Sequence, residues 1–235
     1  MWRYRNGWFR DADFERRTGA IAAVSARERG DMDRVGALER NLRSLGLAAN
    51  SWAGGVQVHG TRVRRVAKPT APKRLPATDG FATNAPGVTL WIRVADCAPV
   101  FISDPRTGAG ALVHAGWRGA RKNILSAAVR RMGKWYGSRP AELRITIGPH
   151  IQSCCYAVGP DVAKHFQKAR GAVVAGQLDL TRALRTEARR AGVPPNHVTA
   201  APQCTACGRR LFSFRRHRTE KRLAAVMAIV DRKDA

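Results

Sequence analysis

The chain has 235 residues, 44% of them hydrophobic, and its 42 lysines and arginines against 17 aspartates and glutamates give a net charge of +25. This length predicts one domain, residues 1–235, with a packed core, and no apolar stretch approaches the ~20 residues that cross a bilayer, which excludes a membrane-spanning protein. The charge would attract anions, from phosphorylated metabolites to nucleic acid, but no nucleic-acid-binding motif accompanies it.

In the first half of the chain, one helix and two strands are predicted around a proline-rich loop. Asp31 is the expected N-cap of the helix, in which apolar residues recur at spacings of three and four until Gly46 ends it. Residues 55–59 are typical of a short strand, and the segment 67–78, with three prolines, is typical of a loop. Alternating apolar residues then predict a strand over 88–94.

The second half of the chain combines further strands with helices. Residues 98–103 and 109–114 are a predicted strand pair around a turn, and the apolar periodicity of 124–135 predicts a helix that ends at Gly137. The other expected elements are a strand over 143–147, helices near 160–169 and 181–191, and strands over 196–201, 211–214 and 223–230. Because strands and helices do not alternate strictly, the expected fold class is α+β, with mixed sheets flanked by helices.

Two features bear on the cellular compartment. The weakly apolar run 16–26 begins with a basic pair, as a secretory signal does, but acidic residues precede it and Arg27 follows it at once. The five cysteines are an odd number in a chain of medium size, which argues against a disulfide framework and for thiols kept reduced. A cytoplasmic protein is therefore expected.

Three potential metal ligands stand at or just beyond the ends of predicted strands. His59 ends the strand 55–59, Cys97 follows the strand 88–94, and His114 ends the strand 109–114. Glycine or proline lies close to each of them, so the three side chains can converge on one cleft. Two imidazoles and a thiolate are a ligand set that zinc favours, with a fourth position left for water or substrate. From spacing alone, three core residues with satisfied hydrogen bonds are the alternative.

Two further sequence features can bear chemistry. Gly116-Trp117-Arg118-Gly119 joins a strand to a helix, so free backbone N–H groups and Arg118 could hold an anion such as phosphate, although a tight turn with an exposed arginine is the alternative. Cys204 and Cys207 have the spacing of a redox pair or of half a zinc site, or they have a structural role. Cys154 and Cys155 are adjacent and cannot readily bridge each other.

Several short motifs follow one another along the chain. The main ones are Gln57-Val58-His59-Gly60, Ala95-Asp96-Cys97-Ala98-Pro99-Val100 and His114-Ala115-Gly116-Trp117-Arg118-Gly119. The others are Thr78-Asp79-Gly80, Thr83-Asn84-Ala85-Pro86-Gly87-Val88, Ile147-Gly148-Pro149, Tyr156-Ala157-Val158-Gly159, Cys204-Thr205 and Phe212-Ser213-Phe214-Arg215-Arg216. Together they resemble the polyphenol oxidoreductase laccase-domain family, also described as purine nucleoside phosphorylases and, in some bacteria, as peptidoglycan editing factors. The resemblance is strongest over residues 55–232.

The resemblance implies a zinc enzyme that acts on purine nucleosides. The implied reactions are phosphorolysis of adenosine, inosine and methylthioadenosine, and hydrolytic deamination of adenosine. The implied zinc ligands are His59, Cys97 and His114, with copper as a less favoured occupant of the same site. The implied catalytic residues are Cys97, His114 and Arg118, and the implied substrate contacts are Gln57, Arg118 and Tyr156. Arg118 would contact phosphate.

The resemblance also implies a fold related to a family of cysteine hydrolases and deamidating toxins, and a monomer is expected. Ala157 stands where the family usually has a glutamate, so the reaction that persists is open. One alternative is a hydrolase that edits a peptidoglycan precursor, with zinc or with Cys97 as nucleophile and His114 as base. Another is a basic nucleic-acid-binding protein on a degenerated enzyme scaffold. Four-copper chemistry is not supported, because the chain has six histidines and no His-x-His pair.

Overall fold

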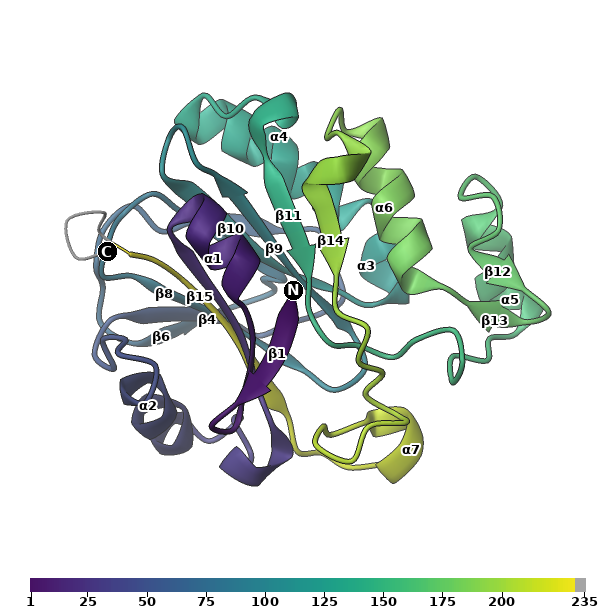
Figure 1. Cartoon of the computed structure of the whole chain (residues 1–235), viewed down its shortest axis with the longest axis horizontal. Coiled ribbons are helices and arrows are strands. Elements are labelled where there is room, and N and C mark those ends of the chain that lie inside the picture. The colour runs from purple at the N-terminus through teal and green to yellow at the C-terminus, as the bar shows by residue number, and fades with distance from the viewer. Residues whose placement is uncertain (231–235) are drawn as a thin grey trace.

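Two mixed β-sheets pack face to face at the centre of the computed structural model, which describes residues 1–230 (Figure 1). The alternation of side chains along each strand explains the packing. In β9 (Ala98–Asp104), Phe101 lies in the core between the two sheets, whereas Val100 and Ile102 lie on the opposite face. In β8 (Thr89–Val94), Leu90 and Ile92 lie in that same central core. Each sheet therefore has a second apolar face, which helices cover.

The first sheet has seven strands, which pair antiparallel from β1 to β8 and parallel from β8 through β4 to β6. In the order in which they lie side by side they are β1 (Trp2–Arg5), β2 (Trp8–Asp11), β3 (Ala20–Ser25), β15 (Leu223–Ile229), β8, β4 (Trp52–Gly55) and β6 (Lys73–Leu75). The N-terminal and C-terminal segments of the described chain thus lie within one sheet.

The second sheet has six strands and is also mixed, because β14 with β11 and β7 with β5 are parallel pairs and the other pairs are antiparallel. In spatial order the strands are β14 (Val198–Ala200), β11 (Arg144–Ile147), β9, β10 (Ala109–Ala115), β7 (Gly80–Thr83) and β5 (Val63–Arg65). A separate hairpin consists of β12 (Val173–Val174) and β13 (Gln177–Leu178).

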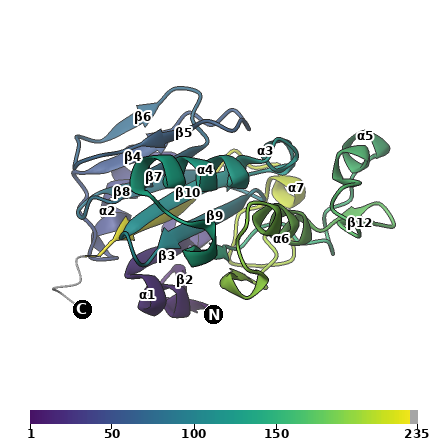
Figure 2. The ribbon, with the colours of Figure 1, turned by 90° about the horizontal axis from the view of Figure 1, so that it is seen from above.

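Helices cover the outer faces of the two sheets (Figure 1 and Figure 2). Residues of α4 (Ile124–Tyr136) and α6 (Leu180–Arg190) pack on the six-stranded sheet, and residues of α2 (Val35–Arg43) pack on the seven-stranded sheet. The other helices are α1 (Ala12–Thr18), α3 (Trp117–Arg121), α5 (Pro160–Ala163) and α7 (Phe214–His217), with 3₁₀ turns at Arg27–Arg29, Pro140–Glu142, Lys164–Phe166 and Pro195–His197. None of the helices within residues 1–230 has the length and apolarity needed to cross a membrane.

The α+β class with mixed sheets agrees with the sequence prediction, as do the central strands and the helices near 124–135 and 181–191. The predicted strand 55–59 is wrong, because β4 ends at Gly55 and the N–H groups of residues 58–60 donate to the carboxylate of Asp79 instead of to a neighbouring strand. The first helix begins at Val35 rather than after Asp31, since the Asp31 carboxylate accepts the N–H groups of Asp33 and Arg222 instead of capping it.

Three other segments differ from their predictions. The loop 67–78 contains the short strand β6, which pairs parallel with β4. The predicted strand 211–214 is wrong, because the Ser213 side chain accepts the N–H of Arg216 and begins the helix α7. The helix predicted near 160–169 is only the four-residue α5 followed by a 3₁₀ turn. The last five residues of the predicted domain 1–235 lie outside the described residues.

Candidate active site

The side chains of His59, Cys97 and His114, here called the His–Cys–His centre, converge at one place in the fold. Their potential ligand atoms all lie within 4.8 Å of one another, and the two imidazole rings are 4.9 Å apart between centroids. His59 follows β4 of the seven-stranded sheet, His114 belongs to β10 of the six-stranded sheet, and Cys97 lies on the link from β8 to β9 that joins the two sheets. The centre therefore forms where the chain crosses between the two sheets.

The side chain of Asp79 holds two of the three potential ligands in place, although the sequence alone gives it no role. Its fully buried carboxylate accepts the backbone N–H groups of His59 at 2.9 Å, Gly60 at 2.9 Å and Val58 at 3.2 Å. One of its oxygens also lies 3.1 Å from Nδ1 of His114. Burial alone would raise the pKa of Asp79, but the hydrogen bond from His114 and those from the backbone hold it below its ordinary value.

The contact with Asp79 determines which nitrogen of His114 is available as a ligand. An ionised carboxylate can only accept hydrogen bonds, so Nδ1 of His114 carries a proton and donates a hydrogen bond to Asp79. The lone pair of a neutral ring is then on Nε2. A carboxylate behind a histidine is the usual way in which proteins orient a metal-ligating imidazole and raise its basicity. The arrangement thus fits a metal ligand better than it fits a histidine of the core.

Close packing around the centre limits which residues the chain can carry there. A Cβ atom on Gly116 would lie 2.8 Å from Sγ of Cys97 and 3.0 Å from Nδ1 of His59, so only glycine fits without moving the potential ligands. The residue before Cys97, Asp96, has a φ of 90°, and its carboxylate accepts the Thr205 hydroxyl and the Arg215 N–H, each at 2.6 Å. These bonds hold the turn that presents Cys97.

The thiol and the imidazole of the centre favour an ion pair when no metal is bound. Burial would raise the pKa of Cys97, but the positive charge of His114 and hydrogen bonds from both histidines outweigh it and lower the pKa to about 6. Burial would likewise lower the pKa of His114, but the Cys97 thiolate and Asp79 raise it to about 9. The pair can therefore supply a thiolate at neutral pH, which is the form that binds metals and acts as a nucleophile.

A pocket of about 620 Å³ opens over the His–Cys–His centre. Its basic lining residues are Arg93, Arg118, Arg215, Arg218 and Arg222, its acidic ones are Asp33, Asp96 and Glu220, and its aromatic ones are Trp117, Tyr156 and Phe214. Within residues 1–230, the side chains of Arg118, Arg215 and Arg218 form no ion pair with a carboxylate. The pocket thus combines an excess of positive charge with flat apolar surfaces, a combination suited to an anionic and aromatic ligand.

The predicted site residues outside the centre all line this pocket, but they differ in their contacts. Arg118 lies in α3 with its guanidinium 4.5 Å from the centre of the Trp117 ring. Tyr156 is half-buried beside the centre, and burial and the Cys97 charge raise the pKa of its hydroxyl. The amide of Gln57 donates to the carbonyl of Arg93 at 2.9 Å and accepts its N–H at 2.8 Å, so both ends already bind the backbone of β8.

These features define a class of α+β proteins with a His–Cys–His centre between two mixed sheets. The chain matches the family model described as "Multi-copper polyphenol oxidoreductase laccase" over residues 19–230, and it belongs to that family. It is 31% identical over 225 residues to a protein of Streptomyces coelicolor named as a purine nucleoside phosphorylase, covering 90% of this chain and 92% of that protein. It is 30% identical over 207 residues to the purine nucleoside phosphorylase YlmD of Geobacillus stearothermophilus, covering 81% of this chain and 75% of that protein.

The solved structures agree with this assignment. The crystal structure of YlmD from Geobacillus stearothermophilus superposes with a TM-score of 0.86 at 27% identity and covers 97% of this chain and 98% of that one. A hypothetical protein, YfiH, from Bacillus licheniformis superposes with a TM-score of 0.85 at 24% identity over the same shares of the two chains. The family inferred from the motifs is thus confirmed, and so is the α+β fold with mixed sheets.

Proposed function

We propose that the protein is a purine nucleoside phosphorylase, as its relatives are named, and that it depends on zinc. The observation that carries this proposal is the His–Cys–His centre at the floor of a pocket lined by five arginines and three aromatic rings. Phosphate and a purine nucleoside are the two substrates of such an enzyme, and the pocket offers a surface of suitable chemistry to each of them.

The donor set of the centre fits zinc. Two imidazoles and a thiolate within 4.8 Å of one another form one of the ligand sets found in catalytic zinc sites, and Asp79 orients one imidazole from behind. When bound, zinc would act as a Lewis acid and lower the pKa of a coordinated water. The three donors are too few for a multicopper cluster, so four-copper chemistry has no support; a single copper ion, which two imidazoles and a thiolate can also bind, is the less favoured occupant of the same site.

The residues of the pocket divide the work of phosphorolysis. Arginine guanidinium groups bind phosphate oxygens in a bidentate manner, and Arg118, beside the centre, is the one we assign to the phosphate. The rings of Trp117, Tyr156 and Phe214 provide surfaces on which a purine can stack. An oxygen of hydrogen phosphate, bound through Arg118, would attack C1′ of the ribose and the bond from C1′ to the purine nitrogen would break. The purine nitrogen would take up the proton that hydrogen phosphate loses on becoming the ribose 1-phosphate ester.

The test combines metal content with product analysis. Purified wild-type protein and Cys97→Ser would be measured for zinc by mass spectrometry and for turnover of adenosine, inosine and methylthioadenosine with and without phosphate. We expect free base and ribose 1-phosphate only with phosphate present, and loss of both turnover and the zinc of this centre in Cys97→Ser. Inosine and ammonia formed from adenosine without phosphate would reveal the deaminase reaction that the family resemblance implies. Release of the free base at the same rate with and without phosphate would refute the proposal that the protein is a phosphorylase.

The ion pair of Cys97 and His114 favours a second candidate, a cysteine hydrolase. In a cysteine hydrolase the Cys97 thiolate would be the nucleophile and the His114 imidazole would be the base. The buried carboxylate of Asp79 would orient that imidazole. This assignment would also suit the expected relation to cysteine hydrolases and the editing of a peptidoglycan precursor. Chelation distinguishes the two functions: a cysteine hydrolase would keep its activity when zinc is removed and would lose it when iodoacetamide alkylates Cys97, whereas a zinc enzyme would lose its activity to the chelator.

A further inference from the structure

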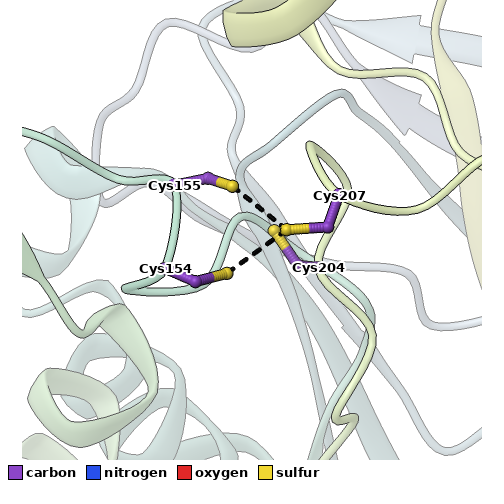
Figure 3. A group of neighbouring side chains, drawn as sticks. All are labelled: Cys154, Cys155, Cys204 and Cys207. Carbon is purple, nitrogen blue, oxygen red and sulfur yellow. Dashed lines mark hydrogen bonds between the residues drawn. The ribbon is translucent and has the colours of Figure 1, made fainter.

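Four cysteines outside the active site meet in a second cluster (Figure 3). Cys154 and Cys155 lie on the segment after β11, and Cys204 and Cys207 lie on the segment after β14. The Cys207 sulfur is 3.1 Å from the Cys155 sulfur and 3.4 Å from the Cys154 sulfur, and all four sulfurs lie within 4.8 Å of one another. Two strand ends of the six-stranded sheet thus bring together residues about fifty positions apart.

We propose that Cys154, Cys155, Cys204 and Cys207, here called the four-cysteine cluster, bind one zinc ion as a structural site separate from the His–Cys–His centre. Tetrahedral coordination with zinc–sulfur bonds of about 2.3 Å places the sulfurs about 3.8 Å apart. The sulfur separations in the cluster, from 3.1 Å up to the 4.8 Å limit, lie on both sides of that value. Small side-chain rotations are therefore enough to surround the ion.

The backbone already holds the two segments in register. Residues His150 and Cys204 form a parallel β-bridge, and the N–H of Thr205 donates to the carbonyl of His150 at 3.1 Å. The N–H of Gly208 donates to the carbonyl of Cys204 at 2.9 Å, which closes the turn between Cys204 and Cys207. The N–H of Gln152 points at the Cys204 sulfur at 3.4 Å, a contact that favours a thiolate. The ligands thus need little ordering to bind a metal.

The surrounding charge suits a site with four thiolates. Zinc with four thiolates has a net charge of about −2, and the chain as a whole has a charge of +25. Two guanidinium groups bind the segments that present the cysteines: Arg216 donates to the carbonyl of Ala206 at 3.0 Å, and Arg215 donates to the carbonyl of Ala157 at 2.8 Å. Attraction from these arginines would offset part of the excess negative charge.

The proposed zinc site would stabilise the position of residues that line the pocket over the active centre. The same two segments present Tyr156, Phe214 and Arg215 to that pocket. Thr205, between the two C-terminal cysteines, donates its hydroxyl to Asp96, which precedes Cys97. Zinc in the four-cysteine cluster would therefore fix one wall of the pocket without contacting the reacting atoms.

The competing outcome is a disulfide, for which Cys207 is close enough to Cys155 and Cys154. All five cysteines are free thiols in this structure, and a separation of 3.1 Å exceeds the S–S bond length of about 2.05 Å. A disulfide would remove two of the four ligands and would make the protein lighter by two hydrogen atoms. The mass of the intact chain therefore separates the two outcomes.

The test uses the full-length chain, produced with added zinc and purified in a reducing buffer. Native mass spectrometry and elemental analysis would compare wild type, Cys97→Ser and Cys207→Ser, with Cys154→Ser as a second variant at an exposed position. We expect about two zinc ions in wild type and about one in each variant. Cobalt replacement then assigns the metal that is left: sulfur-to-metal charge-transfer absorption typical of four thiolates should persist in Cys97→Ser and disappear in Cys207→Ser.

Three results would overturn the proposal. They are a folded Cys97→Ser protein without any zinc, a wild-type chain that stays lighter by two hydrogens in reducing buffer, and stoichiometric iron in place of zinc at the four cysteines. The count of two zinc ions in wild type rests on the proposed function, but the two proposals fail differently: the test needs no turnover, Cys97→Ser leaves the four-cysteine cluster intact, and one zinc in both wild type and Cys97→Ser would support the cluster and contradict zinc at the active centre. Circular dichroism of each variant would show whether the protein has folded.

Discussion

A carboxylate oxygen of Asp79 lies 3.1 Å from Nδ1 of His114 while the same oxygen accepts the N–H of His59 at 2.9 Å. One buried side chain therefore sets the ring orientation of one potential ligand and the backbone position of another. It does so across sequence separations of twenty and thirty-five residues. The geometry of the His–Cys–His centre depends on this contact as much as on the three potential ligands themselves.

Asp79→Asn should weaken zinc binding at the centre by about tenfold to a hundredfold. Asparagine has an N–H₂ group where the carboxylate has a second acceptor oxygen, so either Nδ1 of His114 and the N–H of His59, or the N–H groups of Val58 and Gly60, would lose their acceptor, and the potential ligands would be held less firmly. Competition with a chromophoric chelator would measure the affinity. Asp104→Asn is the matched control, because Asp104 is also buried and accepts backbone N–H groups, those of Arg106 and Thr107, away from the centre. Equal loss in both variants would refute an orienting role.

Gly116→Ala should fold but bind zinc about tenfold or more weakly, since a site displaced by ~1 Å loses much of its function. The added methyl group would lie within 3.0 Å of the Cys97 sulfur and of Nδ1 of His59, and one of them would have to move. Zinc affinity and the unfolding temperature would be measured together. Gly36→Ala is the control: its Cβ would meet only the Arg40 guanidinium at 3.6 Å, so zinc binding should not change.

The parts of the fold that local patterns describe were predictable. In β8, β9 and β10 apolar residues alternate or run continuously, and Cys97 and His114 lie near strand ends as the sequence predicts, whereas His59 lies in the loop beyond the end of β4. The sequence does not predict the strands β1 and β2, because each has only four residues and the exposed residues of β1 are both arginines, while β2 is buried except for the half-buried Arg10. The strand β3 was missed because its small buried residues, Ala20–Ser25, look like a weak targeting segment.

The contacts that complete the two clusters could not be predicted, because they depend on distant pairing of strands. Nothing near Asp79 in the sequence shows that its carboxylate faces residues 58–60 and His114. In the same way, Cys204 and Cys207 looked like an isolated pair, and only the bridge between His150 and Cys204 places them beside Cys154 and Cys155. Spacing identifies ligands that share a loop, whereas ligands from separate strands need the sheet order.

Arg118→Gln should raise the KM for phosphate by about tenfold to a hundredfold, because a hydrogen bond between charged groups contributes ~1.5–3 kcal/mol. The effect on the KM for the nucleoside should be smaller, since the aromatic side chains of the pocket stay in place. Steady-state kinetics with each substrate varied in turn would measure both constants. Arg189→Gln removes an exposed arginine from α6 and serves as the control for lost surface charge. If the KM for phosphate is unchanged in Arg118→Gln, phosphate binds to other arginines of the pocket and the assignment of Arg118 is wrong.

The last prediction concerns the pH dependence of stability, which Glu187 should influence. This carboxylate of α6 is buried and accepts the N–H of Ser126 at 2.8 Å, so it caps the first turn of α4 from the neighbouring helix. Burial raises its pKa to about 7 from the ordinary value of 4.5, although the hydrogen bonds from Ser126 oppose the shift. A carboxyl group with a raised pKa binds its proton more tightly in the folded protein than in the unfolded one.

The sign of the effect follows from proton linkage. Between about pH 4.5 and pH 7 the folded state holds a proton that the unfolded state has released, so this group's contribution to stability is lost as the pH rises. Relative to Glu187→Gln, which stays neutral and can still accept the Ser126 N–H, wild type should lose on the order of 3 kcal/mol between about pH 5 and about pH 8. Urea unfolding of both proteins at several pH values would measure the difference. Glu142→Gln, at an exposed turn, should run parallel to wild type, and a Glu187→Gln curve that also runs parallel would show that Glu187 ionises normally.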